Sequence, residues 1–230
     1  MKIGIIGAME QEVSILLKQM ENKVAEQHGP CTIYTGSLSG KNVVLVQSGV
    51  GKTAAAMSTT MLLDNHKPDL VLNTGSAGGF AEDLEVGDLV ISNEVRHHDV
   101  DLTAFGFEMG QGYGFPAAFT SDATLVERAQ AAASRQTDLQ AKVGLICSGD
   151  SFMACPDKVA QARDNFPNMI AVEMEAAAIA QVCAQFNTPF VVVRALSDIA
   201  GKSSHQSFET FLQQAAKHSS QLVCDFIRLC

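Results

Sequence analysis

The sequence predicts one α/β domain over residues 1–230, in which a mostly parallel, mixed central β-sheet is wrapped by helices. Short β-branched runs recur along the chain, and several are apolar at every position, as in strands that are covered on both faces. Segments with helical periodicity lie between these runs, which is the pattern of a parallel sheet with crossover helices. No Pro/Ser-rich linker or internal repeat divides the chain, so we expect a single domain.

Seven runs are predicted to form strands, and the chain after each strand is where ligands of an open α/β sheet bind. The predicted strands are Lys2–Ile6, Val43–Gln47, Asp69–Asn73, Asp88–Ser92, Lys142–Cys147, Ile170–Val172 and Phe190–Leu196. The third run is followed by Gly75–Gly79, which we predict to be a turn where backbone approaches a ligand closely.

Four segments are predicted to form helices because their apolar residues recur three or four positions apart. They are Val13–Met20, Thr53–Asp64, Met174–Phe186 and Phe208–Ile227. The last of these keeps the helical period longest and is the clearest of the four.

Composition excludes several classes of protein. The chain has 16 Lys and Arg against 25 Asp and Glu, a net charge of −9, so it lacks the basic footprint of a protein that binds nucleic acid or anionic lipid. No apolar run reaches about 18 residues, and charges interrupt the start too early for a signal peptide. The six cysteines form no Cys-x-x-Cys pair and are expected to be buried thiols, which favours a cytoplasmic protein.

Several familiar motifs are incomplete. Gly49–Thr53 imitates the end of a phosphate-binding loop, but Val46 stands where that loop requires glycine. Neither a Gly-x-Gly-x-x-Gly nor a Gly-x-Ser-x-Gly motif occurs. His97 and His98 precede Asp99 without a further spaced ligand, so we expect a solvated or hydrogen-bonded turn there. The sequence therefore contains none of these motifs in complete form.

The Gly-rich segment Thr103–Phe119 has neither helical nor strand periodicity, yet it carries five aromatic residues. They are Phe105, Phe107, Tyr113, Phe115 and Phe119. Two interpretations stay open: the segment folds back onto its own domain, or it forms a subunit interface or pocket wall, because exposed aromatic clusters usually mark association surfaces.

Carboxylates follow four of the predicted strands. The residues concerned are Glu10 and Glu12 after the first strand, Asp150 after the fifth, Glu173 and Glu175 after the sixth and Asp198 after the seventh. Arg194 is the one nearby cation in the sequence. Since the carboxyl ends of parallel strands share one edge of a sheet, we expect an acidic rim there.

Each candidate also has a structural interpretation. Glu175 opens a helix, where an acidic side chain is favourable with the helix dipole, and Asp198 is a suitable N-cap for a short turn. On the sequence alone, Phe152 and Met153 fit core packing better than contact with a ligand. Spacing alone does not choose between Glu10 and Glu12.

A rim of carboxylates suits one kind of reaction. It repels anions, since two like charges 4 Å apart cost about 4 kcal/mol at an effective dielectric near 20, and it stabilises a cationic transition state such as a ribosyl oxocarbenium ion. Glycosidic cleavage needs one acid for the leaving group and one base for water. Crowding and burial are expected to raise the pKa of one carboxyl enough for it to keep a proton near pH 7.

Five segments, in order over essentially the whole chain, resemble bacterial 5′-methylthioadenosine/S-adenosylhomocysteine nucleosidases, of the nucleoside phosphorylase/nucleosidase superfamily. They are Ile3–Glu10, Asn73–Gly79, Ser148–Phe152, Ala171–Ala176 and Arg194–Asp198. The resemblance implies a nucleoside phosphorylase-like three-layer fold and hydrolysis of methylthioadenosine, S-adenosylhomocysteine and 5′-deoxyadenosine.

The resemblance also implies the catalytic roles. Asp198 would protonate purine N7, so that adenine leaves as a neutral molecule. Glu12 would orient and deprotonate the attacking water, with Ser76 and Arg194 as helpers. Two rivals remain: a phosphate-dependent phosphorylase of the same fold, and a nucleoside-binding protein without catalysis.

Further residues are implied to bind substrate. Glu175 would hold the ribose hydroxyls with the Met174 backbone, while Phe152 stacks on adenine and the Met153 backbone reads its edge. Gly78 would lie against the nucleoside, and Met9, Val50 and Phe208 would surround the 5′-alkylthio group. Glu173 and Ser197 complete the set, because they lie in the segments Ala171–Ala176 and Arg194–Asp198 that carry the resemblance. The family is similar in being homodimeric, with Phe105 and Phe107 reaching into the partner's site and no metal or cofactor.

Overall fold

Ten strands join into one mixed β-sheet in the computed structural model, which describes residues 1–202 and 204–230. The strands are β1 (Lys2–Gly7), β2 (Glu21–His28), β3 (Cys31–Leu38), β4 (Lys41–Gln47), β5 (Leu70–Gly79), β6 (Leu89–His97), β7 (Phe119–Thr120), β8 (Ala141–Ser148), β9 (Met169–Glu173) and β10 (Phe190–Ile199). The helices are α1 (Glu10–Gln19), α2 (Lys52–His66), α3 (Ala123–Ala133), α4 (Pro156–Asn165), α5 (Ala176–Gln185) and α6 (Ser204–Leu229), with a 3-10 turn η1 (Thr103–Phe105).

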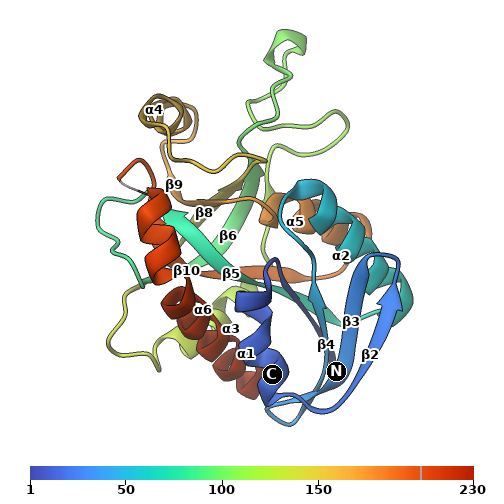
Figure 1. Ribbon diagram of the computed structural model, residues 1–230. Helices are drawn as coiled ribbons and strands as arrows, with labels where there is room; N and C mark the ends of the chain where they lie inside the picture. The colour runs from blue at the N-terminus through green and yellow to red at the C-terminus, as the bar shows by residue number, and fades with distance from the viewer. Residues whose placement is uncertain (203) are drawn as a thin grey trace.

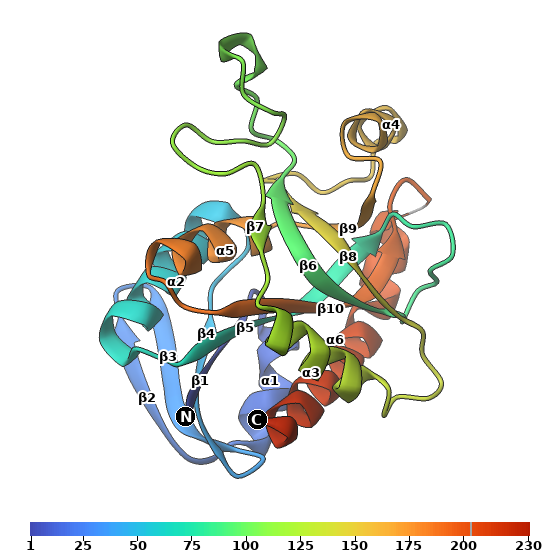
Figure 2. The same ribbon diagram turned by 180° about the vertical axis from the view of Figure 1, so that it is seen from behind.

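Helices cover both faces of the sheet, which gives the predicted three layers (Figures 1 and 2). Alternate residues of each central strand enter opposite cores, as the two-residue period of a strand requires. Ile5 packs with α1, α3 and α6, whereas its neighbour Ile6 packs with α2 and α5. Strand β10 does the same, with Val193 in the first core and Val192 in the second.

The sheet closes on itself in its central part. Five strands follow one another in the order β10-β6-β8-β9-β5. Strand β5 also pairs with β10, in parallel and along nearly the whole length of both strands, and this pairing closes the ring. The closure depends on glycine: a Cβ at Gly79 would lie 2.8 Å from side-chain carbons of both Leu196 and Ile199. As a result, the carboxyl ends of β5 and β10 and the end of β9 meet at one place.

All seven predicted strands and all four predicted helices are present, with bounds that differ by a few residues. One prediction was wrong: Gly75–Gly79 is the end of β5, not a turn, because these glycines serve close strand pairing. The sheet is mixed, with parallel ladders such as β1–β4, β5–β10 and β6–β8 and antiparallel ones such as β2–β3 and β6–β10.

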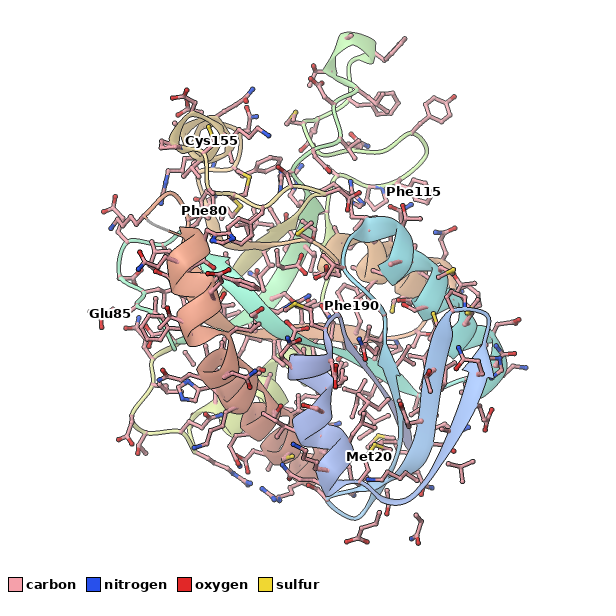
Figure 3. The ribbon with its side chains drawn as sticks, viewed as in Figure 1. Met20, Phe80, Glu85, Phe115, Cys155 and Phe190 are labelled. Carbon is pink, nitrogen blue, oxygen red and sulfur yellow. The ribbon has the colours of Figure 1, made fainter. Side chains whose placement is uncertain are left out.

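The segment between β6 and β7 projects from the body of the molecule (Figure 1). Phe105 and Tyr113 are 79% and 80% exposed, so the interpretation that this segment folds back onto its own domain is wrong for these two. It holds for Phe119, which is buried, and for Phe115, labelled in Figure 3, which packs partly against the core under α2 and α5.

All six cysteines are free; Cys155 is exposed, Cys230 is half-buried and the other four are buried. Among the helices of the described residues, none combines the length and apolar character needed to cross a membrane.

Candidate active site

A cavity lies where β1, β5, β9 and β10 end; it encloses about 580 Å³ of empty space, counted together with the open solvent at its mouth. Its lining comprises Ala8, Met9, Glu12, Val50, Ser76, Ala77, Gly78, Ser151, Phe152, Met153, Val172, Glu173, Met174, Glu175, Arg194, Ser197, Asp198 and Phe208. Every residue predicted for the catalytic and substrate-binding sets is among them. Phe105 and Phe107 are not, because they lie on the projecting segment.

Glu12 lies on the first turn of α1 and is 1% exposed, whereas Glu10, which spacing could not separate from it, is exposed. One carboxylate oxygen, Oε2, accepts hydrogen bonds from the amides of Ala8 and Met9, at 2.9 and 3.0 Å. The other, Oε1, accepts from the amide and the hydroxyl of Ser76, both at 2.9 Å. An ionised carboxylate accepts hydrogen bonds and donates none. The four donors around Glu12 therefore hold its side chain in one position at the cavity wall.

Glu173 and Glu175 frame the start of α5 and have different partners. Glu173 accepts hydrogen bonds from the amides of Glu175 and Ala176, from the Ser148 hydroxyl and from Arg194. Glu173, rather than Glu175, therefore satisfies the open amides of the helix N-terminus. The helix-capping interpretation of Glu175 is wrong, because its side chain makes no cap hydrogen bond.

Glu175 instead reaches across the cavity to the start of α2. Its Oε1 accepts a hydrogen bond of 2.8 Å from the Gly51 amide, and its Oε2 lies 3.5 Å from the Arg194 guanidinium. Gly51 has φ of +95°, a conformation that favours glycine. Sequence reasoning missed Gly51, although the glycines around Val50 were noted as the end of an incomplete phosphate-binding loop.

Arg194 is fully buried in β10 and serves the protein rather than an anionic ligand. It donates to the Asn73 side chain at 2.9 Å, to the Ser76 carbonyl at 3.3 Å and to Glu173. Burial alone would lower the pKa of this guanidinium, but Glu173, Glu175 and Glu12 together raise it. Among the described residues that line the cavity, Arg194 is the one Lys or Arg, beside four carboxyl groups.

Asp198 lies within β10 and is 3% exposed, so the N-cap interpretation is wrong. A register shift between Leu196 and Asp198 in the pairing with β5 changes where its side chain points. The Ser197 hydroxyl donates to its Oδ1 at 2.9 Å. On the other side is Gly78, where a Cβ would lie only 3.2 Å from Oδ2.

The apolar part of the cavity is formed by Phe152, Met153 and Phe208. Phe152 is 41% exposed, so core packing is wrong for it, and its ring meets that of Phe208 edge-on with centroids 5.7 Å apart. Met153 is buried and belongs to the core beneath α4. The cavity is thus lined on one part by the rings of Phe152 and Phe208 and on another by carboxyl groups.

Lys52, Asp99 and Asp150 form a hydrogen-bonded group that the sequence did not reveal. This group joins the start of α2 to the loops that follow β6 and β8. The Lys52 ammonium pairs with Asp99 at 2.5 Å, and Asp99 also accepts from the Asp150 amide. Asp150 accepts in turn from the Lys52 amide at 2.7 Å. His97 is the last residue of β6 rather than part of a turn; it is buried and hydrogen-bonded to Gln181, so of the two expected states the hydrogen-bonded one is present and the solvated one is not.

Comparisons with known proteins identify the family. The family model described as the phosphorylase superfamily matches residues 2–228. A 5′-methylthioadenosine/S-adenosylhomocysteine nucleosidase from Anoxybacillus flavithermus is 59% identical over 223 residues, which are 97% of this chain and 96% of that protein.

Solved structures give the same result. The crystal structure of such a nucleosidase from Colwellia psychrerythraea, in complex with adenine, is 54% identical with a TM-score of 0.97 and covers 99% of this chain and 94% of its own. The Neisseria meningitidis enzyme, in complex with methylthio-immucillin-A, is 46% identical with a TM-score of 0.98 over 100% and 99% of the two chains.

The charge distribution predicts how stability depends on pH. Burial, reinforced by Glu173, raises the pKa of Glu175 from 4.5 to about 8, against the opposing effects of Arg194 and the Gly51 amide. Between these two values the unfolded chain loses this proton and the folded chain keeps it, so the free energy of unfolding falls as pH rises. A pKa unit corresponds to about 1.4 kcal/mol, which makes the total a few kcal/mol.

Glu175→Gln should therefore flatten the decline in stability between pH 4.5 and about 8. Urea unfolding of wild type and variant across this range measures the difference. Glu10→Gln, which removes an exposed carboxyl near the same cavity, is the control and should keep the wild-type slope. A Glu175→Gln protein with the full wild-type slope would contradict the assignment.

Proposed function

Because this chain belongs to the phosphorylase superfamily, and within it to the 5′-methylthioadenosine/S-adenosylhomocysteine nucleosidases, we propose that it hydrolyses the N-ribosidic bond of these two nucleosides and of 5′-deoxyadenosine. The products from the first two are adenine with 5-methylthioribose or S-ribosylhomocysteine. One observation carries the proposal: four carboxyl groups share the cavity with one guanidinium that is already engaged. No cofactor is required.

The leaving group is activated at the end of the cavity where Asp198 lies. Asp198 as an acid protonates N7 of the purine while the bond between N9 and C1′ breaks, so adenine departs neutral. The Ser197 hydroxyl, which donates to Oδ1, orients the carboxyl group. Gly78 leaves room for the nucleoside to approach it, because a side chain there would contact Oδ2.

Water is activated by Glu12, another carboxyl group of the same cavity. A water oxygen attacks C1′, one of its protons passes to Glu12, and the hydroxyl remains on the ribose. The Ser76 hydroxyl and amide hold the accepting carboxylate in place, and Arg194 anchors the Ser76 carbonyl. Positive charge that develops on the ribose in the transition state lies between carboxylates, which lowers its energy.

Binding of the substrate is divided between the two halves of the cavity. Glu175, with the Met174 backbone, holds the ribose hydroxyls, and Glu173 positions Glu175 through its amide. Phe152 stacks on adenine while the Met153 backbone contacts the edge of the base. Met9, Val50 and Phe208 line the slot for the 5′-alkylthio group.

The proposal predicts that adenine release does not depend on phosphate. A phosphorylase must hold an anionic nucleophile with cations, and Arg194 already donates to Asn73 and Glu173. Adenine formed from methylthioadenosine is measured in phosphate-free buffer and again with phosphate added. Equal rates are expected. Strict dependence on phosphate would favour the phosphorylase, and binding without any adenine release would favour a binding protein.

Two substitutions separate the acid from the base. Asp198→Asn removes the proton donor and should lower kcat by about 10²–10⁴, the usual contribution of a positioned acid. Glu12→Gln should still bind nucleoside but hydrolyse it poorly, because the amide cannot accept the proton of water. Glu10→Gln is the matched control and should retain normal turnover. Near-normal turnover of Glu12→Gln would reject Glu12 as the base.

The protein is also proposed to be a cytoplasmic homodimer. Phe105, 79% exposed on the projecting segment, is a suitable side chain to enter the partner's cavity together with Phe107. The free cysteines suit a reducing compartment. The net charge of −9 provides no attraction for nucleic acid or an anionic membrane.

Phe105→Ala should therefore raise KM for the nucleoside or dissociate the dimer, because it removes an aromatic contact from the partner's cavity. Light scattering measures the mass in solution, and steady-state kinetics measures KM. Phe186→Ala, at a 43% exposed phenylalanine near the end of α5, is the control and should change neither. A wild-type monomer with unchanged kinetics in Phe105→Ala would contradict this arrangement.

A further inference from the structure

Three potential metal ligands meet on the surface where the tip of the β2–β3 hairpin lies against the end of α2. They are Glu26 and His28 of β2 and His66 of α2, and one ligand atom from each lies within 4.8 Å of the other two. Glu26 Oε2 is 3.4 Å from His28 Nε2 and 3.9 Å from His66 Nε2. We refer to these three residues as the hairpin cluster; none of them lines the cavity.

Local structure holds the hairpin cluster in place. Glu26 and His28 are two positions apart on a strand, so they project from the same face. Gly29, with φ of +58°, then turns the chain toward β3 and packs near Met61 of α2. His66 is the last residue of α2, which ends at a left-handed C-cap. The ligands thus come from a strand and a helix whose relative position is set by packing.

One ring nitrogen in the hairpin cluster lacks a partner. The His66 side chain is only 10% exposed, and among the described residues its Nε2 is buried with no hydrogen-bond partner. A buried polar atom without a partner is costly, and each such atom in a folded protein requires an explanation. This nitrogen lies on the Glu26 side of the ring, and the His28 ring meets the His66 ring edge-on at 5.9 Å.

We propose that the hairpin cluster binds one divalent transition-metal ion of the zinc type. Two imidazoles and one carboxylate suit zinc, cobalt, nickel or copper rather than magnesium or calcium. Tetrahedral zinc has bonds of about 2.0–2.2 Å, which separates its ligand atoms by about 3.4 Å. Glu26 and His28 are already at this separation, and His66 needs a small movement. Three protein ligands leave the fourth position to water.

The metal would fasten an edge strand. Within the described residues, β2 pairs with β3 alone and is exposed over almost its entire length, so little else holds its end to the body. Lys2 is the nearby cation and opposes the ion, but its ammonium is hydrogen-bonded to the His66 carbonyl at 2.7 Å. The 15 residues of α2 separate His66 from Gly51 at the cavity by about 22 Å. Metal binding and catalysis can therefore be measured independently.

The test uses the full chain and cobalt(II) and zinc chloride as probes. Cobalt binding is followed by its visible absorption, which is intense for tetrahedral sites, and zinc is measured by competition and by its effect on Tm. We expect one ion per chain and a higher Tm with zinc. His28→Ala, His66→Gln and Glu26→Gln should each weaken binding by at least about tenfold, since each removes one of three ligands.

Two controls define the outcome. His205→Ala removes an exposed histidine that pairs with Glu209 and meets the Phe152 ring, far from the hairpin cluster in sequence, and Cys155→Ser removes the exposed thiol labelled in Figure 3; both should leave metal binding unchanged. Glu26 is exposed, so its variant folds even if a histidine variant does not. Absence of stoichiometric binding, or binding that survives all three ligand substitutions, would overturn the proposal. Adenine release is assayed in parallel, so failure of the proposed function is a separate result.

Discussion

A fully buried guanidinium organises the acidic cavity. An isolated charge in the interior is strongly unfavourable, and so is a carboxylate beside other carboxylates. Arg194 and Glu173 resolve both problems together, because each supplies the opposite charge and the hydrogen bonds that the other needs. Through Asn73 and the Ser76 carbonyl the same guanidinium also fixes the end of β5. Glu173 and Arg194 thus balance each other beside the other three carboxyl groups of the cavity, Glu12, Glu175 and Asp198.

The closed part of the sheet places these carboxyl groups together. Residues of β5, β9 and β10 converge because β5 pairs with both of the other strands at its carboxyl end. Gly75 is the tightest point, since a Cβ there would lie 2.5 Å from Arg194 and 2.6 Å from Glu12. The absence of a side chain at Gly75 of β5 therefore leaves the space in which Arg194 of β10 and Glu12 of α1 approach the same point.

Reasoning from strand ends brought together Glu12, Glu175 and Asp198, which all line the cavity, because the parallel strands β1, β5 and β10 end at one edge of the sheet and β9 pairs with the same end of β5. The same reasoning failed where the residue pattern of a segment does not indicate the structure that the segment adopts. The β2–β3 hairpin was missed because β2 is exposed along nearly its whole length and shows no alternation. Gly75–Gly79 was predicted to be a turn because single-sequence patterns do not reveal close strand pairing. The hairpin cluster could not be predicted, since His66 joins Glu26 and His28 only through the packing of α2.

Glu175 connects the electrostatics of the empty cavity with the proposed reaction. Its pKa of about 8 means that the cavity without ligand keeps a proton near neutral pH and so limits its own negative charge. Ribose hydroxyls that donate hydrogen bonds stabilise the ionised carboxylate, which lowers the pKa and releases the proton. Glu175 would then carry its full negative charge only when the ribose is bound. The ribose is the part of the substrate that gains positive charge in the transition state. In the proposed reaction, substrate binding would thus complete the electrostatic stabilisation, and the positive charge of Arg194 would offset part of the negative charge that Glu175 gains on ionisation.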